Sequence, residues 1–175
     1  ALADDQGVTP SDLEGTGITD ATTLKLALTA ANRLTHEILE GLSANDLRAA
    51  CTNAIIAHPV GILQGVDNLF TGKVERVDAE LLQTLLAQGI VPVVPPLGFD
   101  GDGKTYRVNS DAVAVAISDA LKASKLIYIT TQDGLIRQGQ VIRQMLVGDL
   151  LDIINQRKHE LAPEGRRDLA PVAFL

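Results

Sequence analysis

Three polar residues, Arg107, Asn109 and Asp111, stand at alternate positions where an extended segment leads into a helix. An arginine guanidinium can bind a carboxylate through two parallel hydrogen bonds, and an asparagine amide can hydrogen-bond the same ligand. Asp111 would then orient a lysine or an ammonium group. Because strand carboxyl ends and helix N-termini favour anions, this pattern predicts a site for a small ligand with a free carboxylate.

The same three residues also have a purely structural interpretation. Asn109 is a common helix N-cap, and Asp111 in the first turn suits the positive end of the helix dipole. Arg107 would then be an exposed strand residue. By themselves the residues favour this structural interpretation, and they leave the binding interpretation open.

The pattern of apolar residues predicts alternating strands and helices. Asp20 or Thr19 is placed to cap the first helix, Asp78 the second, and Asn109 or Ser110 the third. This order is typical of an α/β protein with a largely parallel sheet and an added antiparallel hairpin. The expected elements are a helix from 21 to 42, a strand within 50–60, a hairpin within 62–77, a helix over 79–88, a strand over 90–94, an extended arm before 109, a helix through 123, a buried strand over 125–130 and a helix over 141–161.

The composition excludes several classes of function. The chain has 175 residues, is 46% hydrophobic and carries a net charge of −7, which fits one sizeable core and argues against a nucleic-acid partner. No apolar run reaches the roughly 18–20 residues that a membrane helix needs. We therefore expect a soluble, cytoplasmic protein without a membrane or nucleic-acid partner.

The sequence also predicts no metal site. The three histidines have no metal-ligand spacing, and Cys51 is the single cysteine. The Asp/Gly-rich loop at 100–103 superficially resembles a calcium loop, but that motif needs an oxygen ligand at its fifth position and glycine at its sixth. Lys104 and Thr105 stand there, so a hairpin loop is the better interpretation.

Three motifs follow one another in order: PVVPPLG at 92–98, YRVNSD at 106–111 and ITTQDG at 129–134. With the preceding GKVERVDAELLQTLLAQGIVPVV at 72–94, they resemble the amino-acid kinase family, specifically N-acetylglutamate kinase and the kinase-like domain of N-acetylglutamate synthase. In the kinases the corresponding motifs are PVVAPVG, YNVNAD and LTDVPG. The resemblance extends over roughly 19–134, and it implies a three-layer αβα sandwich with a mainly parallel sheet.

The differences from the kinases fall on functional positions. Arg107 takes the place of the asparagine that holds the substrate α-carboxylate, and Gly17 that of a substrate-binding arginine. Asp111 keeps the aspartate that organises the catalytic lysines. Thr131 replaces an aspartate near the nucleotide, so the resemblance implies that Thr131 and Asp133 are remnants of a nucleotide site.

The resemblance thus implies an amino-acid kinase-like domain over 1–175 that is a piece of a longer protein. The glycine-rich opening strand and the lysines that contact the phosphates are missing from the chain. Phosphoryl transfer depends almost entirely on such charges, so we assign no catalytic residue and no cofactor to this chain.

Three hypotheses remain. The first is the regulatory and oligomerisation domain of an N-acetylglutamate synthase, in which a separate domain transfers acetyl from acetyl-CoA to L-glutamate in the first step of arginine biosynthesis. The second is an N-acetylglutamate kinase. The third is a non-catalytic module that binds a small amino acid. The resemblance implies glutamate, N-acetylglutamate or arginine as ligand, and a homo-oligomer as the assembly.

Overall fold

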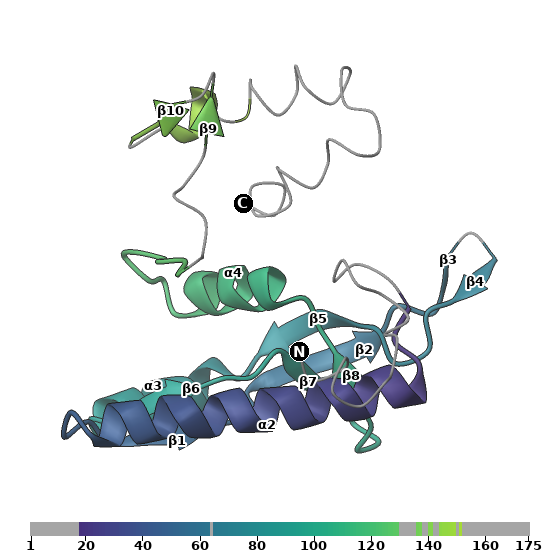
Figure 1. Cartoon of the computed structure of the whole chain (residues 1–175), viewed down its shortest axis with the longest axis horizontal. Coiled ribbons are helices and arrows are strands. Elements are labelled where there is room, and N and C mark those ends of the chain that lie inside the picture. Colours follow the sequence, from purple (N-terminus) through teal and green to yellow (C-terminus); the bar gives the residue numbers. More distant parts are fainter. Residues whose placement is uncertain are drawn as a thin grey trace. The chain divides into compact units, whose positions relative to one another are not determined.

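The computed structural model describes residues 18–63, 65–129, 136–137, 140–141, 144–149 and 151. The chain divides into two compact units, Ala1–Ser124 and Lys125–Leu175, and each is described by itself (Figure 1). The elements are α2 Ala21–Ser43, β1 Ala49–Cys51, β2 Ile55–Pro59, β3 Ile62–Leu63, β4 Val66–Asp67, β5 Gly72–Val77, α3 Ala79–Ala87, β6 Val91–Val93, β7 Leu97–Phe99, β8 Thr105–Arg107 and α4 Ser110–Ala120 in the first unit, and β9 Ile136–Arg137 and β10 Gln140–Val141 in the second.

A four-stranded sheet in the order β5-β2-β7-β8 forms the centre of the first unit. Strand β2 runs parallel to β7 and antiparallel to β5, and β7 and β8 form an antiparallel hairpin. A further parallel pair joins β1 to β6, and β3 and β4 form a short hairpin. The predicted α/β class is confirmed. A hairpin does lie within 62–77, but it joins 62–63 to 66–67, whereas the extended segment that begins at Gly72 pairs with β2 instead. The central sheet itself is mixed, because hairpin connections bring in its antiparallel strands.

The core of the first unit lies between the central sheet and α4. Ile55 and Ala57 of β2 are fully buried and pack with Val108 and Val113. Partly buried valines of β5 and Ile117 of α4 surround them. In the view of Figure 1, the strands of the central sheet are drawn between α4 and α2. Among the described residues, no helix combines the length and the apolar character that crossing a membrane requires.

The helices begin at the predicted caps. The Asp20 carboxylate accepts a hydrogen bond from the backbone N–H of Thr23 at 2.7 Å, and Asp78 accepts one from Leu81 at 3.0 Å. Each bond satisfies a backbone donor that the first turn of a helix leaves without a partner. Gly89 follows α3 with a φ of 66°, which is the left-handed conformation that ends many helices.

Two glycines permit a close approach of neighbouring strands. A Cβ on Gly98 would lie 2.3 Å from Cβ of Ala57, and a Cβ on Gly72 would lie 2.5 Å from Cβ of Tyr106. Both distances are far below van der Waals contact. The close contact of β7 with β2 therefore depends on the absence of a side chain at Gly98. The contact of Gly72 in β5 with Tyr106 in β8 depends in the same way on the absence of a side chain at Gly72.

Two predicted strand boundaries are wrong. The single strand expected within 50–60 is two strands, β1 and β2, which pair with different neighbours. The Thr52 backbone N–H still donates to the Val93 carbonyl at 2.9 Å, and the chain then leaves β6 to enter the central sheet. An apolar run gives no indication of such a change of partner.

The prediction of a buried strand over 125–130 is also wrong for residues 125–129, which the structure describes. Residues 125–129 have no strand assignment, and Ile127 and Ile129 are 78% and 99% exposed. A strand needs a neighbour that takes its backbone hydrogen bonds, and none of the described strands pairs with this segment. The preceding helix ends at Ala120 rather than at 123. Val141, the expected start of the last helix, lies in β10, but residues 147–149 and 151 within the expected range are helical. Residues 152–161 lie outside the described residues.

Replacing Gly98 by alanine tests the contact between β7 and β2. The new methyl group would overlap Ala57, and overpacking of this kind lowers the free energy of unfolding by about 1–3 kcal/mol. Gly41→Ala is the matched control, since Gly41 lies in α2 with nothing within 4 Å of the added Cβ; alanine there should raise stability by roughly 0.5–1 kcal/mol. Urea denaturation followed by circular dichroism measures both variants. A Gly98→Ala variant with the wild-type midpoint would contradict the close contact.

Candidate functional site

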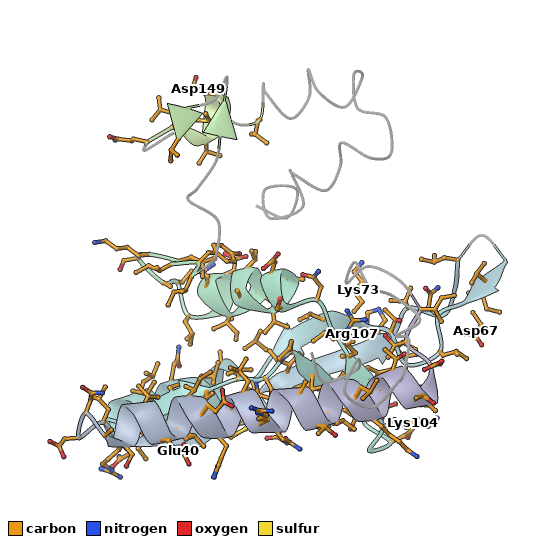
Figure 2. All side chains as sticks on the ribbon, in the orientation of Figure 1. Glu40, Asp67, Lys73, Lys104, Arg107 and Asp149 are labelled. Atoms are coloured by element: carbon orange, nitrogen blue, oxygen red, sulfur yellow. The ribbon has the colours of Figure 1, made fainter. Side chains whose placement is uncertain are left out.

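Arg107 is the last residue of β8, and it lies against two segments that are distant in sequence. Its backbone N–H donates to the Phe70 carbonyl at 2.9 Å, and it forms a parallel bridge with Thr71. One guanidinium nitrogen, Nη1, lies 3.5 Å from the Thr19 hydroxyl. Figure 2 shows Arg107 in the region where the N-terminal end of α2 meets the strands. The half-buried guanidinium therefore stands at a junction of three segments.

The loop between β7 and β8 holds the strand that carries Arg107. The Asp100 carboxylate accepts backbone N–H bonds from Asp102 and Lys104, and its other oxygen accepts the Tyr106 hydroxyl at 2.9 Å. The Lys104 bond, more than any other contact, lowers the pKa of Asp100, because it favours the charged carboxylate. Burial, and then the bond to Asp100, raise the pKa of Tyr106. These bonds confirm the hairpin interpretation of this loop.

Asn109 is the N-cap of α4. Its side-chain oxygen accepts hydrogen bonds from the backbone N–H groups of Asp111 at 2.9 Å and Ala112 at 3.0 Å. The Val113 N–H is bonded to the Asn109 carbonyl. Three donors of the first turn are thus already satisfied, so the helix terminus is not an open anion site. The structural interpretation of Asn109 is confirmed, and its Nδ2 makes no hydrogen bond to any other described residue.

Asp111 lies in the first turn of α4 and is half-buried. Its position fits the helix dipole. Among the residues that the structure describes, Asp111 takes part in no ion pair. The remaining predicted residues, Thr131 and Asp133, lie outside the described residues.

Sequence analysis missed two members of this region, Thr19 and Thr71. Thr19 is completely buried, and the Thr71 hydroxyl donates to the Thr19 hydroxyl at 3.1 Å. The Thr71 hydroxyl also accepts the Thr19 backbone N–H at 2.9 Å. The sequence pattern indicates only a helix cap at Thr19. The signal that could have found it is its place beside Gly17, in the segment that the family resemblance aligns with a substrate-binding arginine.

A separate shallow groove of about 740 Å³ lies at the C-terminal end of α2. Its lining includes Glu40, Asp46, Arg48 and Ile90. Figure 2 shows Glu40 far along α2 from Arg107, and none of the predicted site residues lines the groove. We therefore do not place the carboxylate site there.

The whole chain, residues 1–175, matches the model of the amino acid kinase family. The chain belongs to the amino acid kinase family. The resemblance seen in its motifs is confirmed. The fold class expected from it is supported by this family match together with the α/β topology of the first unit.

The relatives divide between two activities. The chain is 30% identical over 172 residues to an amino-acid acetyltransferase of Vibrio cholerae serotype O1, covering 93% of this chain and 39% of the relative. It is 35% identical over 139 residues to an acetylglutamate kinase of Desulforamulus reducens, covering 77% of this chain and 48% of the relative. The chain thus spans less than half the length of either protein.

Among solved structures, the chain is similar to N-acetylglutamate synthase from Neisseria gonorrhoeae in complex with coenzyme A and N-acetyl-glutamate. The TM-score is 0.80 and the identity 27%, covering 97% of this chain and 39% of that one. The complex of the same synthase with coenzyme A and L-arginine has a TM-score of 0.74 at 25% identity, covering 97% and 41%.

Truncating Asn109 separates its cap role from any role in binding. Asn109→Ala should lower the free energy of unfolding by about 1 kcal/mol, because two N–H groups of α4 lose their acceptor. Asn109→Asp keeps the acceptor and should retain most of the stability. Asp78→Ala removes the equivalent cap of α3, which makes it the matched control. Chemical denaturation measures all three, and an Asn109→Ala variant as stable as the wild type would contradict the cap.

Proposed function

We propose that this chain is the kinase-like domain of an N-acetylglutamate synthase. The observation that carries the proposal is the similarity to the Neisseria gonorrhoeae synthase, with a TM-score of 0.80 over 97% of this chain. The alignment to the Vibrio cholerae acetyltransferase, which covers 93% of the chain, supports the same assignment. The whole protein would transfer acetyl from acetyl-CoA to L-glutamate in the cytoplasm, as the first step of arginine biosynthesis.

In this proposal the chain itself is regulatory and structural, and it carries no catalytic group. Acetyl-CoA is a substrate of the whole protein and binds outside this domain. Self-association is the second role, and the exposed apolar side chains of Leu34 and Ile38 on α2 offer surface for it. Light scattering at tens of micromolar measures the mass, and a monomer at that concentration would remove this role from the proposal.

The ligand of the domain is a small amino acid with a free carboxylate: glutamate, N-acetylglutamate or arginine. The Arg107 guanidinium binds the carboxylate. Its positive charge takes the place of the substrate-binding arginine that the kinases have at the position of Gly17. Asn109 assists, because capping α4 with its oxygen leaves the Nδ2 donor for the ligand. Asp111 accepts a cationic group. Complexes of the Neisseria gonorrhoeae synthase with N-acetyl-glutamate and with L-arginine support this ligand class.

An acetylglutamate kinase is the second candidate. The 35% identity to the Desulforamulus reducens enzyme favours it, since this value exceeds the 30% identity to the Vibrio cholerae acetyltransferase. Gly17 and Thr131 oppose it, because they stand where the kinases have a substrate-binding arginine and an aspartate near the nucleotide.

Activity assays on the full-length protein that carries this chain decide between the two candidates. We expect release of coenzyme A from acetyl-CoA in the presence of L-glutamate, and no release of ADP from ATP in the presence of N-acetylglutamate. The chain on its own should show neither activity. Release of ADP above background in a coupled assay would establish the kinase instead.

Arg107→Ala tests the carboxylate site. Hydrogen bonds to charged groups contribute roughly 1.5–3 kcal/mol, so the variant should bind its amino-acid ligand about ten- to a hundredfold more weakly. Arg33→Ala is the matched control, because Arg33 is an exposed arginine of α2 that pairs only with Glu37 among the described residues. Calorimetry with glutamate, N-acetylglutamate and arginine measures the affinities. If Arg107→Ala and the wild type bind all three ligands with equal affinity, Arg107 has a structural role and does not bind the carboxylate.

A further inference from the structure

Two threonine hydroxyls connect Arg107 to segments that lie far from it in sequence. The Arg107 Nη1 is 3.5 Å from the Thr19 hydroxyl, and the Thr71 hydroxyl is 3.1 Å from the same oxygen. Thr71 also accepts the Thr19 backbone N–H at 2.9 Å. Backbone bonds reinforce the junction, since the Phe70 N–H donates to the Thr19 carbonyl and the Phe70 carbonyl accepts the Arg107 N–H, both at 2.9 Å.

The surroundings pack closely against this junction. Thr19 has no exposed surface, so its hydroxyl is not in contact with bulk solvent. Gly72, the residue after Thr71, lies so close to Tyr106 that a Cβ there would be 2.5 Å from the Tyr106 Cβ. The absence of a side chain at Gly72 thus lets Thr71 reach the position beside Arg107 at which the two residues form their bridge.

We propose that Thr19 and Thr71 are positioning residues for the Arg107 guanidinium. This inference rests on the carboxylate site proposed above. An arginine side chain has many rotamers, and fixing it when a ligand binds reduces the affinity. The Thr71 hydroxyl holds Thr19, and the Thr19 hydroxyl restrains the guanidinium before the ligand arrives. The alternative is that the two hydroxyls only satisfy buried polar groups, in which case their loss would affect stability without acting through Arg107.

The binding experiment uses a double-mutant cycle in the full-length protein, with N-acetyl-L-glutamate as the probe. Thr71→Val should weaken binding about three- to tenfold, the range expected when a restraint on one long side chain is removed and the ligand must complete its ordering. Thr71→Ser keeps the hydroxyl and should bind within about twofold of wild type. In the Arg107→Ala background, Thr71→Val should have no further effect, because the group that it positions is gone.

Thr29→Val is the matched control, since Thr29 is an exposed threonine of α2 whose hydroxyl donates to the Lys25 carbonyl. If Thr71→Val does not fold, Thr71→Ala removes the hydroxyl without added bulk and carries the same expectations. Thr71→Val binding that equals wild type, or that weakens equally in both backgrounds, would overturn the positioning role. If Arg107→Ala binds N-acetyl-L-glutamate with the affinity of the wild type, the proposed carboxylate site at Arg107 is itself contradicted.

A second measurement observes the guanidinium directly in the protein without ligand. The Nε–H resonance of Arg107 should report a restricted side chain in wild type and Thr71→Ser, and increased motion on the picosecond-to-nanosecond timescale in Thr71→Val. Equal order of this group in all three proteins would overturn the positioning role, whatever the ligand turns out to be.

Discussion

The close packing of β7 on β2 is the constraint on which the rest of the first unit depends. Ala57 and Gly98 approach so closely that no side chain fits at position 98. This contact seats β7 in the sheet, and the hairpin after β7 then delivers β8 and the start of α4. The face of β2 that carries Ile55 and Ala57 buries Val113 of α4. The positions of Arg107, Asn109 and Asp111 therefore follow from a contact in which none of them takes part.

The structural and functional interpretations of Asn109 do not exclude each other. A helix cap uses the oxygen of the side chain, and a carboxylate ligand needs a donor. The two bonds from the first turn of α4 occupy the oxygen and turn the amide nitrogen away from the helix. Capping is thus compatible with the binding role proposed above for the amide nitrogen. A residue of this kind is hard to classify from sequence, because both roles select the same side chain.

The exchange of charged residues between this chain and the kinases has a physical logic. By the family resemblance, Gly17 stands where the kinases have an arginine, and Arg107 stands where they have an asparagine. The structure places Thr19, two residues after Gly17, 3.5 Å from the Arg107 guanidinium. In the proposed function, Arg107 supplies near Thr19 a positive charge that the kinases carry on the segment preceding it. The carboxylate site proposed above is compatible with such an exchange, whereas phosphoryl transfer requires several charges in fixed positions.

The sequence by itself determined the local features of this protein. The caps at Asp20, Asp78 and Asn109, the helix end at Gly89 and the hairpin loop beginning at Asp100 were all predictable. Each depends on hydrogen bonds or backbone angles within a few residues. The order of motifs was also sufficient to identify the family.

The tertiary structure decided the features that depend on partners distant in the chain. The division of 50–60 into two strands, the exposure of Ile127 and Ile129, and the meeting of Thr19, Thr71 and Arg107 have no local signature. An apolar run indicates a tendency toward burial, but a neighbouring strand must be present to bury it. A threonine is equally suited to a cap, a strand or a buried network, and only the fold determines which hydroxyl lies next to it.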